Sequence, residues 1–324
     1  MKITIVESKK ADFQEWNDVW KNCEYATYFH SPDWLRIWEI YSNGNISTVS
    51  QKISFSDGKS AILVISTKYR LGKIISIHES SPGHNYGGWI SRDTLNPEHK
   101  ELLTYYLIKH YPNLIWRVNP FEQQFSIVDK RLQNDQTYAV PLEQPWGELY
   151  NLLNRSKLPK KVRKAERNKL ELQKISPDSL DDYMEIYHDA KVRWKKKHDI
   201  GSIYTKELFN LLVHSEHCDF WGVYHRNNLI CAGPFLKSST HVVVWGVFAL
   251  SASLHMRPFE FIYYNLICYY RDKGYKWFDF NPSGKRKGVE EFKQQFATKE
   301  LICPVLDTRS APLKLVQKAK SLFS

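Results

Sequence analysis

The chain has 324 residues, 42% of them apolar, and a formal net charge of +11. This size allows a large buried core and exceeds one typical domain, so we expect two domains. No segment approaches the roughly 18 to 20 consecutive apolar residues of a membrane span, which argues against an integral membrane protein. Residues 1–6 lack the apolar region of a signal peptide, so the sequence predicts a cytoplasmic protein.

The cysteines give no sign of a disulfide framework or a zinc site. They are odd in number, lie in apolar contexts and show no C-x-x-C spacing. We therefore expect buried thiols and no bound metal. The five are Cys23, Cys218, Cys231, Cys268 and Cys303.

The first half of the chain predicts two short helices within residues 12–41 and then the order β-β-β-α-β. The expected elements are strands at 47–55, 60–67 and 73–78, a helix at 97–111 and a strand at 114–118. The same order recurs in the second half, with strands at 219–225, 229–236 and 241–248, a helix at 258–273 and a strand at 275–280. This recurrence predicts two related α/β halves, each with a mixed, mostly antiparallel sheet flanked by helices, at residues 1–145 and 146–324.

The segment between the halves is strongly basic. Residues 155–169 hold eight Lys and Arg side chains against Glu166 alone. Such a helix attracts phosphate groups of a nucleotide, RNA, a lipid or a coenzyme. A solvated helix face at a domain junction explains it equally well.

Residues 274–296 combine strand, loop and helix signals around unusual polar residues. Asp279 alternates with large aromatic residues on a strand, where an unpaired charge is costly to bury. A loop of small residues and proline follows, and then a helix whose apolar face has Lys293 on its border. This arrangement is typical of an active-site corner.

The order Phe-Asp-Phe, a small-residue loop and Gly-Val-x-x-Phe-Lys-x-x-Phe resembles the C-terminal signature of the FemAB-like branch of the GNAT N-acyltransferases. That branch includes acetyltransferase-like proteins of polysaccharide gene clusters. The resemblance implies a tandem pair of GNAT-like domains, with the active site in the second. The specific motif covers about twenty residues, and fold analogy alone does not establish chemistry.

The resemblance also implies roles for residues near this motif. Lys293, with Phe292 beside it, would stabilise the transition state; the alternative is a lysine on a surface helix. Asp279 would act as a base or anchor the substrate amine, or else serve as a cap or in a structural ion pair. Ser283, Gly284 and Lys285 would hold a phosphate or the acyl carbonyl, or form an ordinary polar turn.

Other candidates are expected to bind the substrate. In a segment that resembles the acceptor-pocket loop of the family, Trp194 and His198 lie one helical turn apart, and His198 could accept a proton. Tyr204 and Trp245 would stack on a sugar or belong to the core. In the first half, a loop containing His84, Tyr86, Gly87 and Gly88 is similar to the family's glycine-rich substrate loop, although a turn that needs positive φ explains it as well.

Two departures from the family pattern bear on the substrates. The segment before the helix at residue 258 has no glycine-rich phosphate loop, so Arg257 is the remaining candidate for holding the pyrophosphate of coenzyme A. His30-Ser-Pro-Asp-Trp34 is followed by Trp38, where peptidoglycan-building relatives carry lysine, which argues against a muropeptide acceptor.

The sequence therefore predicts an N-acyltransferase that uses acyl-CoA and the amine of a small or glycan-linked acceptor, in envelope polysaccharide synthesis. An aminoacyl-tRNA donor is the first alternative, because it suits the basic helix. A non-catalytic module that binds anionic glycans or RNA is the second. The sequence does not specify the oligomeric state.

Overall fold

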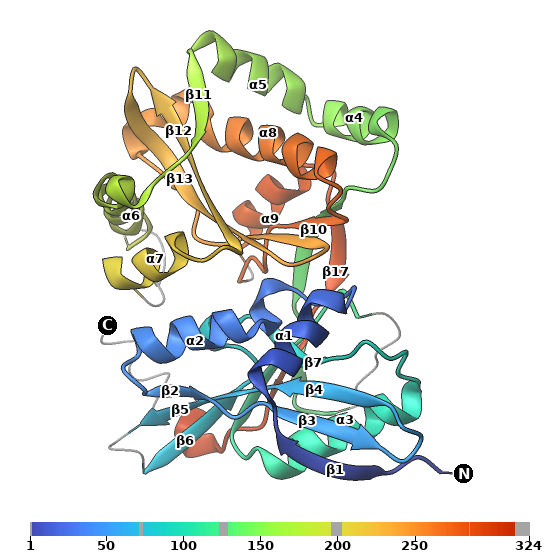
Figure 1. Ribbon diagram of the computed structural model, residues 1–324. Coiled ribbons are helices and arrows are strands. Elements are labelled where there is room, and N and C mark those ends of the chain that lie inside the picture. The colour runs from blue at the N-terminus through green and yellow to red at the C-terminus, as the bar shows by residue number, and fades with distance from the viewer. Residues whose placement is uncertain (1, 71–73, 123–128, 196–202, 285, 315–324) are drawn as a thin grey trace. The chain divides into compact units, whose positions relative to one another are not determined.

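The computed structural model describes residues 2–70, 74–122, 129–195, 203–284 and 286–314 (Figure 1). Contacts divide the chain into two compact units. Unit 1 comprises residues 1–136 and 301–324, and unit 2 comprises residues 137–300.

Unit 1 contains one sheet assembled from hairpins and from strands joined through a helix. Its helices are α1 (Phe13–Asn22), α2 (Pro32–Tyr41) and α3 (Pro97–His110), with short turns η1 (Tyr28–His30) and η2 (Pro82–His84). Its strands are β1 (Ile5–Lys10), β2 (Ile46–Thr48), β3 (Gln51–Phe55), β4 (Ser60–Val64), β5 (Ser66–Arg70), β6 (Ile75–Glu79), β7 (Tyr86–Ile90), β8 (Leu114–Val118), β9 (Leu132–Gln133) and β18 (Val305–Asp307).

The strands of unit 1 follow the order β1-β3-β4-β7-β8-β6-β5-β2, and β18 pairs with β8 and β9. Most pairs are antiparallel, but β6 and β7 both run parallel to β8. The chain reaches β8 from β7 through α3, whose Leu103 and Leu107 are fully buried against the sheet. Unit 1 therefore contains a β-α-β crossover, but the strand before its helix is β7, in a segment expected to be a loop, and not the expected strand at residues 73–78.

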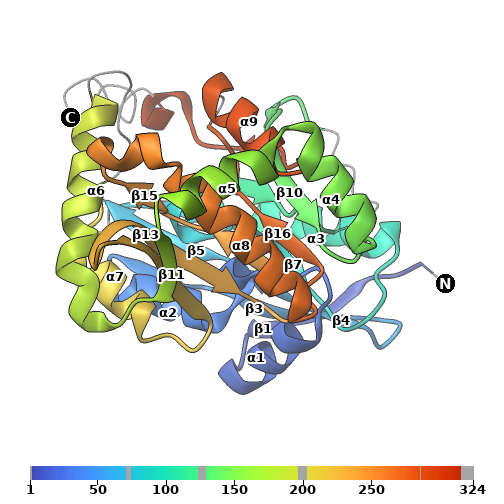
Figure 2. The ribbon, with the colours of Figure 1, turned by 90° about the horizontal axis from the view of Figure 1, so that it is seen from above.

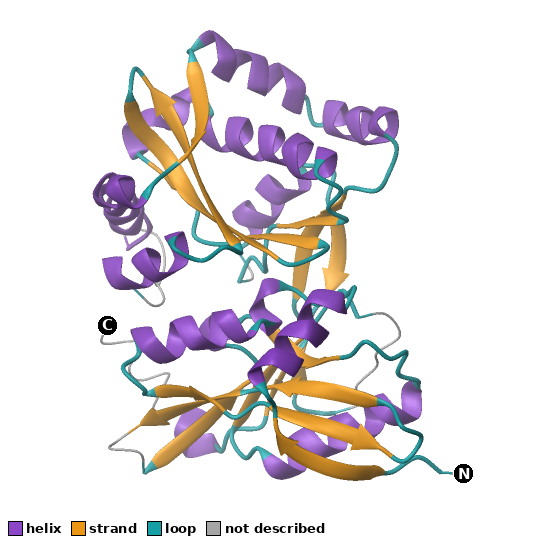
Figure 3. Ribbon diagram, viewed as in Figure 1, coloured by secondary structure: helices purple, strands orange, loops and turns teal. Residues whose placement is uncertain are grey.

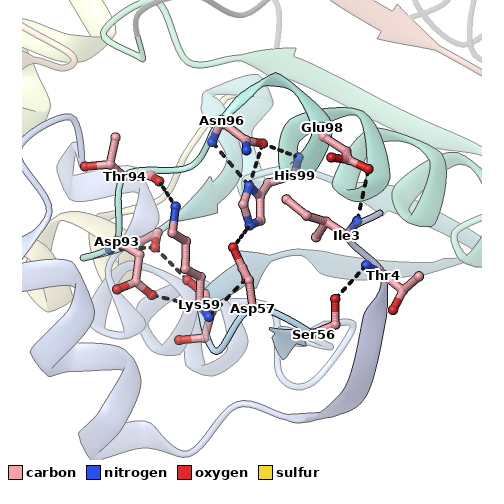
Figure 4. Close-up of polar contacts among 12 residues, drawn as sticks. Ile3, Thr4, Ser56, Asp57, Lys59, Asp93, Thr94, Asn96, Glu98 and His99 are labelled. Carbon is pink, nitrogen blue, oxygen red and sulfur yellow. Dashed lines mark hydrogen bonds and ion pairs between the residues drawn. The ribbon is translucent and has the colours of Figure 1, made fainter. Parts of the chain in front are cut away.

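Side-chain caps and polar contacts fix the start of α3 (Figure 4). Asn96 caps the helix by accepting a hydrogen bond from the backbone of His99, at 3.1 Å. The ring of His99 also reaches Asp57 in the β3–β4 turn, with 3.0 Å between Nε2 and Oδ2. Glu98, in the first turn of α3, accepts the backbone N–H of Ile3. These bonds join the helix to the hairpin and to the first residues of the chain.

Unit 2 contains a second mixed sheet with more helices around it. Its helices are α4 (Trp146–Arg155), α5 (Leu158–Arg167), α6 (Leu180–Lys195), α7 (Lys206–Val213), α8 (Pro258–Asp272) and α9 (Lys287–Gln294), with short turns η3 (Pro177–Ser179) and η4 (Ser251–Met256). Its strands are β10 (Gln136–Pro141), β11 (Leu170–Lys174), β12 (Cys218–His225), β13 (Asn228–Lys237), β14 (His241–Val244), β15 (Phe248–Ala249), β16 (Trp277–Asp279) and β17 (Lys299–Ile302), the last crossing into unit 1.

These strands follow the order β11-β12-β13-β14-β16-β10-β17, and β15 pairs with β13. The strands β14 and β16 are parallel and are connected through α8. Helix α8 packs on the sheet and carries α5 on its outer side (Figure 2). Helices α6 and α7 lie across β12 and β13 from α8 (Figure 1). The predicted fold class, mixed sheets flanked by helices in both halves, is confirmed (Figure 3).

The observed division differs from the expected halves at residues 1–145 and 146–324. Residues 301–324 belong to unit 1, because β18 pairs with β8. Conversely, β10, which was expected in the first half, belongs to unit 2 from residue 137 onward, because it pairs with β16. In each unit, the last strand of the β-α-β crossover thus pairs with a strand from a distant segment: β8 pairs with β18, which follows unit 2 in the chain, and β16 pairs with β10, which follows the first part of unit 1. Strand pairing between segments far apart in sequence leaves no local signal.

Two local predictions also need correction. The expected basic helix at residues 155–169 is shorter, because Arg155 ends α4, Lys157 has φ of 57°, and α5 covers only Leu158–Arg167. Gly87 and Gly88 lie in β7 and not in a loop. A Cβ on Gly87 would lie 2.0 Å from the carbonyl oxygen of Ser80. Glycine is needed here because two backbone segments approach closely.

The thiols are free, and Cys23, Cys218, Cys231 and Cys303 are buried, while Cys268 is partly exposed. Burial raises the pKa of Cys23 and of Cys268 to about 11. In the part of the chain that the structure describes, no helix is long and apolar enough to cross a membrane. The described residues also contain no group of three or more His, Cys, Asp or Glu side chains placed to bind a metal.

Candidate active site

Asp279 lies at the end of β16 in the interior of unit 2. Its side chain is fully buried. Its Oδ1 accepts hydrogen bonds from the hydroxyl of Thr137 on β10, at 2.6 Å, and from the backbone N–H of Asn281, at 3.0 Å. A buried carboxylate needs such donors. Asp279 therefore joins two neighbouring strands and the loop that follows β16.

Asn281 marks the point where the parallel strands β14 and β16 stop pairing. The last paired residues are Val243 and Asp279. Beyond them, the side-chain amide of Asn281 donates to the carbonyl of Val244, at 3.0 Å, in place of a backbone bond. Asn281 has φ of 61°, in the left-handed region that asparagine tolerates better than most residues. The local sequence thus turns the chain out of the sheet here.

Lys293 lies on α9, and its side chain points into the protein. The residue is 7% exposed, and its ammonium donates to the carbonyl of Asn281. Phe292 packs edge-on against Phe259 of α8, and Phe296 is fully buried. The apolar face of α9 therefore holds the lysine against the loop after β16. The alternative of a lysine reaching into solvent does not agree with this burial.

Ser283 and Gly284 continue the same loop. The hydroxyl of Ser283 is buried and has no hydrogen-bond partner among the described residues, which is unusual for a buried polar group. Gly284 is exposed and has φ of 59°. The predicted residue Lys285 lies outside the described residues. The carbonyl of Ser283 accepts from Nε of Arg286, at 3.1 Å.

Arg286 brings a positive charge beside Trp194 of α6. Its guanidinium lies 5.4 Å from the centre of the Trp194 ring, and the ammonium of Lys191 lies 5.6 Å from the same centre. Burial, and then the charge of Arg286, lower the pKa of Lys191. Two cations beside one ring attract an anion.

The aromatic candidates of unit 2 stack in pairs. Tyr204 lies on Trp245, with 5.3 Å between ring centres, and Trp194 contacts Phe248, with 5.4 Å between ring centres. Trp245 is buried, and Tyr204 is partly exposed. The predicted proton acceptor His198 lies outside the described residues.

Arg257 precedes α8, and its side chain already has a partner. Its Nη1 lies 3.2 Å from Oε1 of Glu260, whose buried carboxylate belongs to the first turn of α8. A carboxylate in this turn offsets the positive end of the helix dipole, which a pyrophosphate would otherwise use. The start of α8 therefore fits a pyrophosphate poorly.

The candidates of the first half belong to unit 1. His84 is exposed, and its carbonyl accepts from Nε of Arg117, at 2.8 Å. Tyr86 is fully buried and packs edge-on against Phe29. Together with Gly87 and Gly88 they form a turn and a strand, and the predicted glycine-rich substrate loop is not seen.

The structure thus brings Asp279, Ser283, Lys293 and Trp194 together around one loop. The sequence reasoning passed over Asn281 and Arg286, which make the connecting contacts. A signal for Asn281 was present, because both halves follow their crossover strand with Asn-Pro, at residues 119–120 and 281–282. No comparable signal distinguishes Arg286 from the other cations.

Residues 154–294 match the family model described as an acetyltransferase (GNAT) domain. No curated protein matches the sequence. Among solved structures, FemX is similar over 96% of this chain and 99% of its own, with a TM-score of 0.66 at 12% identity. The C-terminal domain of a putative lysylphosphatidylglycerol synthetase from Agrobacterium fabrum is similar over 95% of this chain and 96% of its own, with a TM-score of 0.59 at 11% identity.

The structure titled L-PGS from Bacillus licheniformis is also similar, over 90% of this chain and 91% of its own, with a TM-score of 0.54 at 12% identity. At such identities these likenesses define the fold. Residues 154–294 are similar to a GNAT acetyltransferase domain, and this match supports acyltransferase as the enzyme class. The family match and the FemX-like fold support the FemAB-like branch that the C-terminal motif resembles.

Proposed function

We propose that this protein transfers an acyl group from acyl-CoA to the amine of a small or glycan-linked acceptor, in the cytoplasm, during the synthesis of envelope polysaccharide. The observation that carries the proposal is the buried ammonium of Lys293 on the carbonyl of Asn281, two residues after the buried Asp279. A fixed cation in a GNAT domain suits a reaction that develops negative charge on a carbonyl oxygen.

In this reaction the acceptor amine attacks the carbonyl carbon of the thioester. A C–N bond forms, and the carbonyl electron pair moves onto oxygen. The resulting oxyanion then collapses, the C–S bond breaks, and the thiolate takes up the proton that the amine has lost. An ammonium has three N–H donors, so Lys293 can hold the Asn281 carbonyl and also donate to the oxyanion. Such a donor lowers the activation free energy by about 3 to 4 kcal/mol.

We propose that Asp279 acts mainly as a positioning residue. Its carboxylate fixes the N–H of Asn281, and the carbonyl of Asn281 accepts the hydrogen bond from Lys293. The Asp279 carboxylate therefore positions the Lys293 ammonium indirectly, by fixing Asn281. A role as base or amine anchor, predicted from the sequence, stays a prediction.

The donor's anionic groups would lie near Arg286 and Lys191, and the buried hydroxyl of Ser283 would donate to the acyl carbonyl. Two observations support this assignment over one at Arg257. The guanidinium of Arg257 is paired with Glu260, whereas Arg286 and Lys191 both lie over the ring of Trp194. A phosphate beside two cations would gain charge-assisted hydrogen bonds.

An aminoacyl-tRNA donor is the second candidate, because one observation favours it. Helix α5 buries Leu158, Val162 and Ala165 and exposes its basic side. No ion pair among the described residues uses the exposed cations of this region, which are Arg155, Lys157, Lys160, Arg163, Lys164, Arg167 and Lys169. Such a surface binds RNA phosphates.

The donor is tested by thermal shift. Acetyl-CoA and longer acyl-CoAs should raise the melting temperature if acyl-CoA is the donor, because a ligand that binds the folded chain stabilises it. Charged tRNA should instead bind with a steep salt dependence if tRNA is the donor. Release of free thiol in the presence of a panel of amino sugars then measures turnover.

Lys293→Met tests the catalytic assignment. We expect turnover to fall by about 100-fold to 1,000-fold with the donor-induced thermal shift kept, because the side chain acts on the transition state. Lys287→Met is the matched control, since Lys287 is on the same helix and its side chain is 89% exposed. Full turnover in Lys293→Met would refute the mechanism, and no turnover of the native chain with any donor would favour a binding module.

A further inference from the structure

A polar cavity of about 220 Å³ lies within unit 1. Its walls come from β6, the turn after β6, β8, β9 and the C-terminal segment around β18. Its volume is below the roughly 300 Å³ at which pockets for drug-sized ligands begin, so it suits a molecule of monosaccharide size or smaller.

The cavity lies at a break in the sheet. Strand β6 pairs with Leu114 and Ile115 of β8, and β7 pairs with Arg117 and Val118 of the same strand. Between the two pairings, residues 80–85 leave the sheet. This break occurs beside the β-α-β crossover of unit 1.

The crossover strands of the two units end in the same way. Arg117 stands two residues before Asn119, as Asp279 stands two residues before Asn281. Arg117 lies opposite Val305 of β18, and Asp279 lies opposite Ala139 of β10. The cavity of unit 1 therefore lies at the end of a crossover strand, as Asp279 does in unit 2.

Among the charged side chains that line the cavity, one carboxylate has no ion-pair partner in the described part of the chain. Arg117 pairs with Asp135, at 2.7 Å, and Arg309 pairs with Asp307, at 2.8 Å. Glu79 is 5% exposed, and its carboxylate has no hydrogen bond or ion pair within 4.0 Å among the described residues. The nearby Lys68 interacts with it only electrostatically.

We propose that Glu79 binds the ammonium group of a small hydroxylated amine in this cavity. A buried carboxylate is costly without a partner, and a ligand cation would supply one. Asn85 and Gln133 also line the cavity and can bond to hydroxyl groups. A ligand carboxylate is disfavoured, because both arginines are paired with aspartates. All residues of this site belong to unit 1, and none of them is assigned a role in the proposed acyl transfer.

Calorimetric titration of the full chain with glucosamine, N-acetylglucosamine and ethanolamine tests the site. Glucosamine and N-acetylglucosamine share the sugar ring, but only glucosamine carries an ammonium. We expect glucosamine to bind at millimolar concentration or below and N-acetylglucosamine to bind at least tenfold more weakly. Tighter binding of glucosamine than of ethanolamine assigns a sugar amine, and equal binding assigns a headgroup-type amine.

Glu79→Gln keeps the shape of the side chain and removes its charge. We expect it to weaken amine binding by about tenfold to a hundredfold, the effect of a charged hydrogen bond. Glu101→Gln, on the exposed side of α3, is the matched control and should bind as the native chain does. No binding of either amine, equal binding of both sugars, or unchanged affinity in Glu79→Gln would overturn the proposal. All of these experiments measure binding and not turnover. Their outcome is therefore independent of the test of Lys293.

Discussion

Lowering the pH from 7 to 5 should destabilise the protein through one histidine, His30 in η1. The ring is fully buried. Its Nδ1 accepts the backbone N–H of Thr27, at 3.2 Å, and its Nε2 has no partner among the described residues. Burial lowers the pKa of His30 from 6.5 to about 4, because a buried ring disfavours the charged form.

The size of the effect follows from this pKa difference. The unfolded chain takes up a proton on His30 as the pH falls through 6.5, whereas the folded chain does so only near 4. The stability contributed by the neutral ring is therefore complete above pH 6.5 and is lost as the pH falls toward 4. At pH 5 the loss relative to pH 7 is about 2 kcal/mol. For a chain of 324 residues, that lowers the melting temperature by about 3 °C.

Urea unfolding at both pH values measures the difference, and His30→Gln isolates the contribution of this residue. The variant keeps an acceptor for Thr27 but does not titrate, so its stability should fall by about 2 kcal/mol less than that of the native chain between pH 7 and pH 5. His78, whose pKa burial also lowers, contributes equally to both proteins. Equal losses in the two proteins would refute the reasoning.

Further variants test the sheet of unit 1 and the donor site of unit 2. Gly87→Ala should cost about 3 kcal/mol or more in urea unfolding, because its Cβ would meet the carbonyl of Ser80, whereas Gly147→Ala, whose Cβ meets nothing within 4 Å, should be neutral or stabilising. A neutral Gly87→Ala would show that the strand can shift. Arg286→Gln should raise the KM for the donor about tenfold with kcat little changed, since its charge binds the donor and not the transition state. An equal fall in kcat would place Arg286 at the reacting carbonyl.

Much of the site could be predicted because its parts are adjacent in sequence. The strand, loop and helix around Asp279 and Lys293 lie within about twenty residues, and apolar periodicity places Lys293 at the edge of the buried face of α9. The sequence could not show that the ammonium bonds to the carbonyl of Asn281, because a backbone acceptor has no residue signature. It also could not reveal the pairing of Arg286 with Trp194, which depends on the packing of α6.

The sequence by itself predicted the crossover helices α3 and α8 and the strands β8 and β16 that follow them, since these depend on the local spacing of apolar and turn residues. It did not separate β2 from β3 or β4 from β5, and it missed β7. Only the tertiary structure decided that β18 pairs with β8 and β10 with β16. It also decided that Gly87 is a packing residue and that Glu79 lines a polar cavity. These features depend on which distant segments come together, and that choice is made by the free energy of the whole fold and not by any one segment.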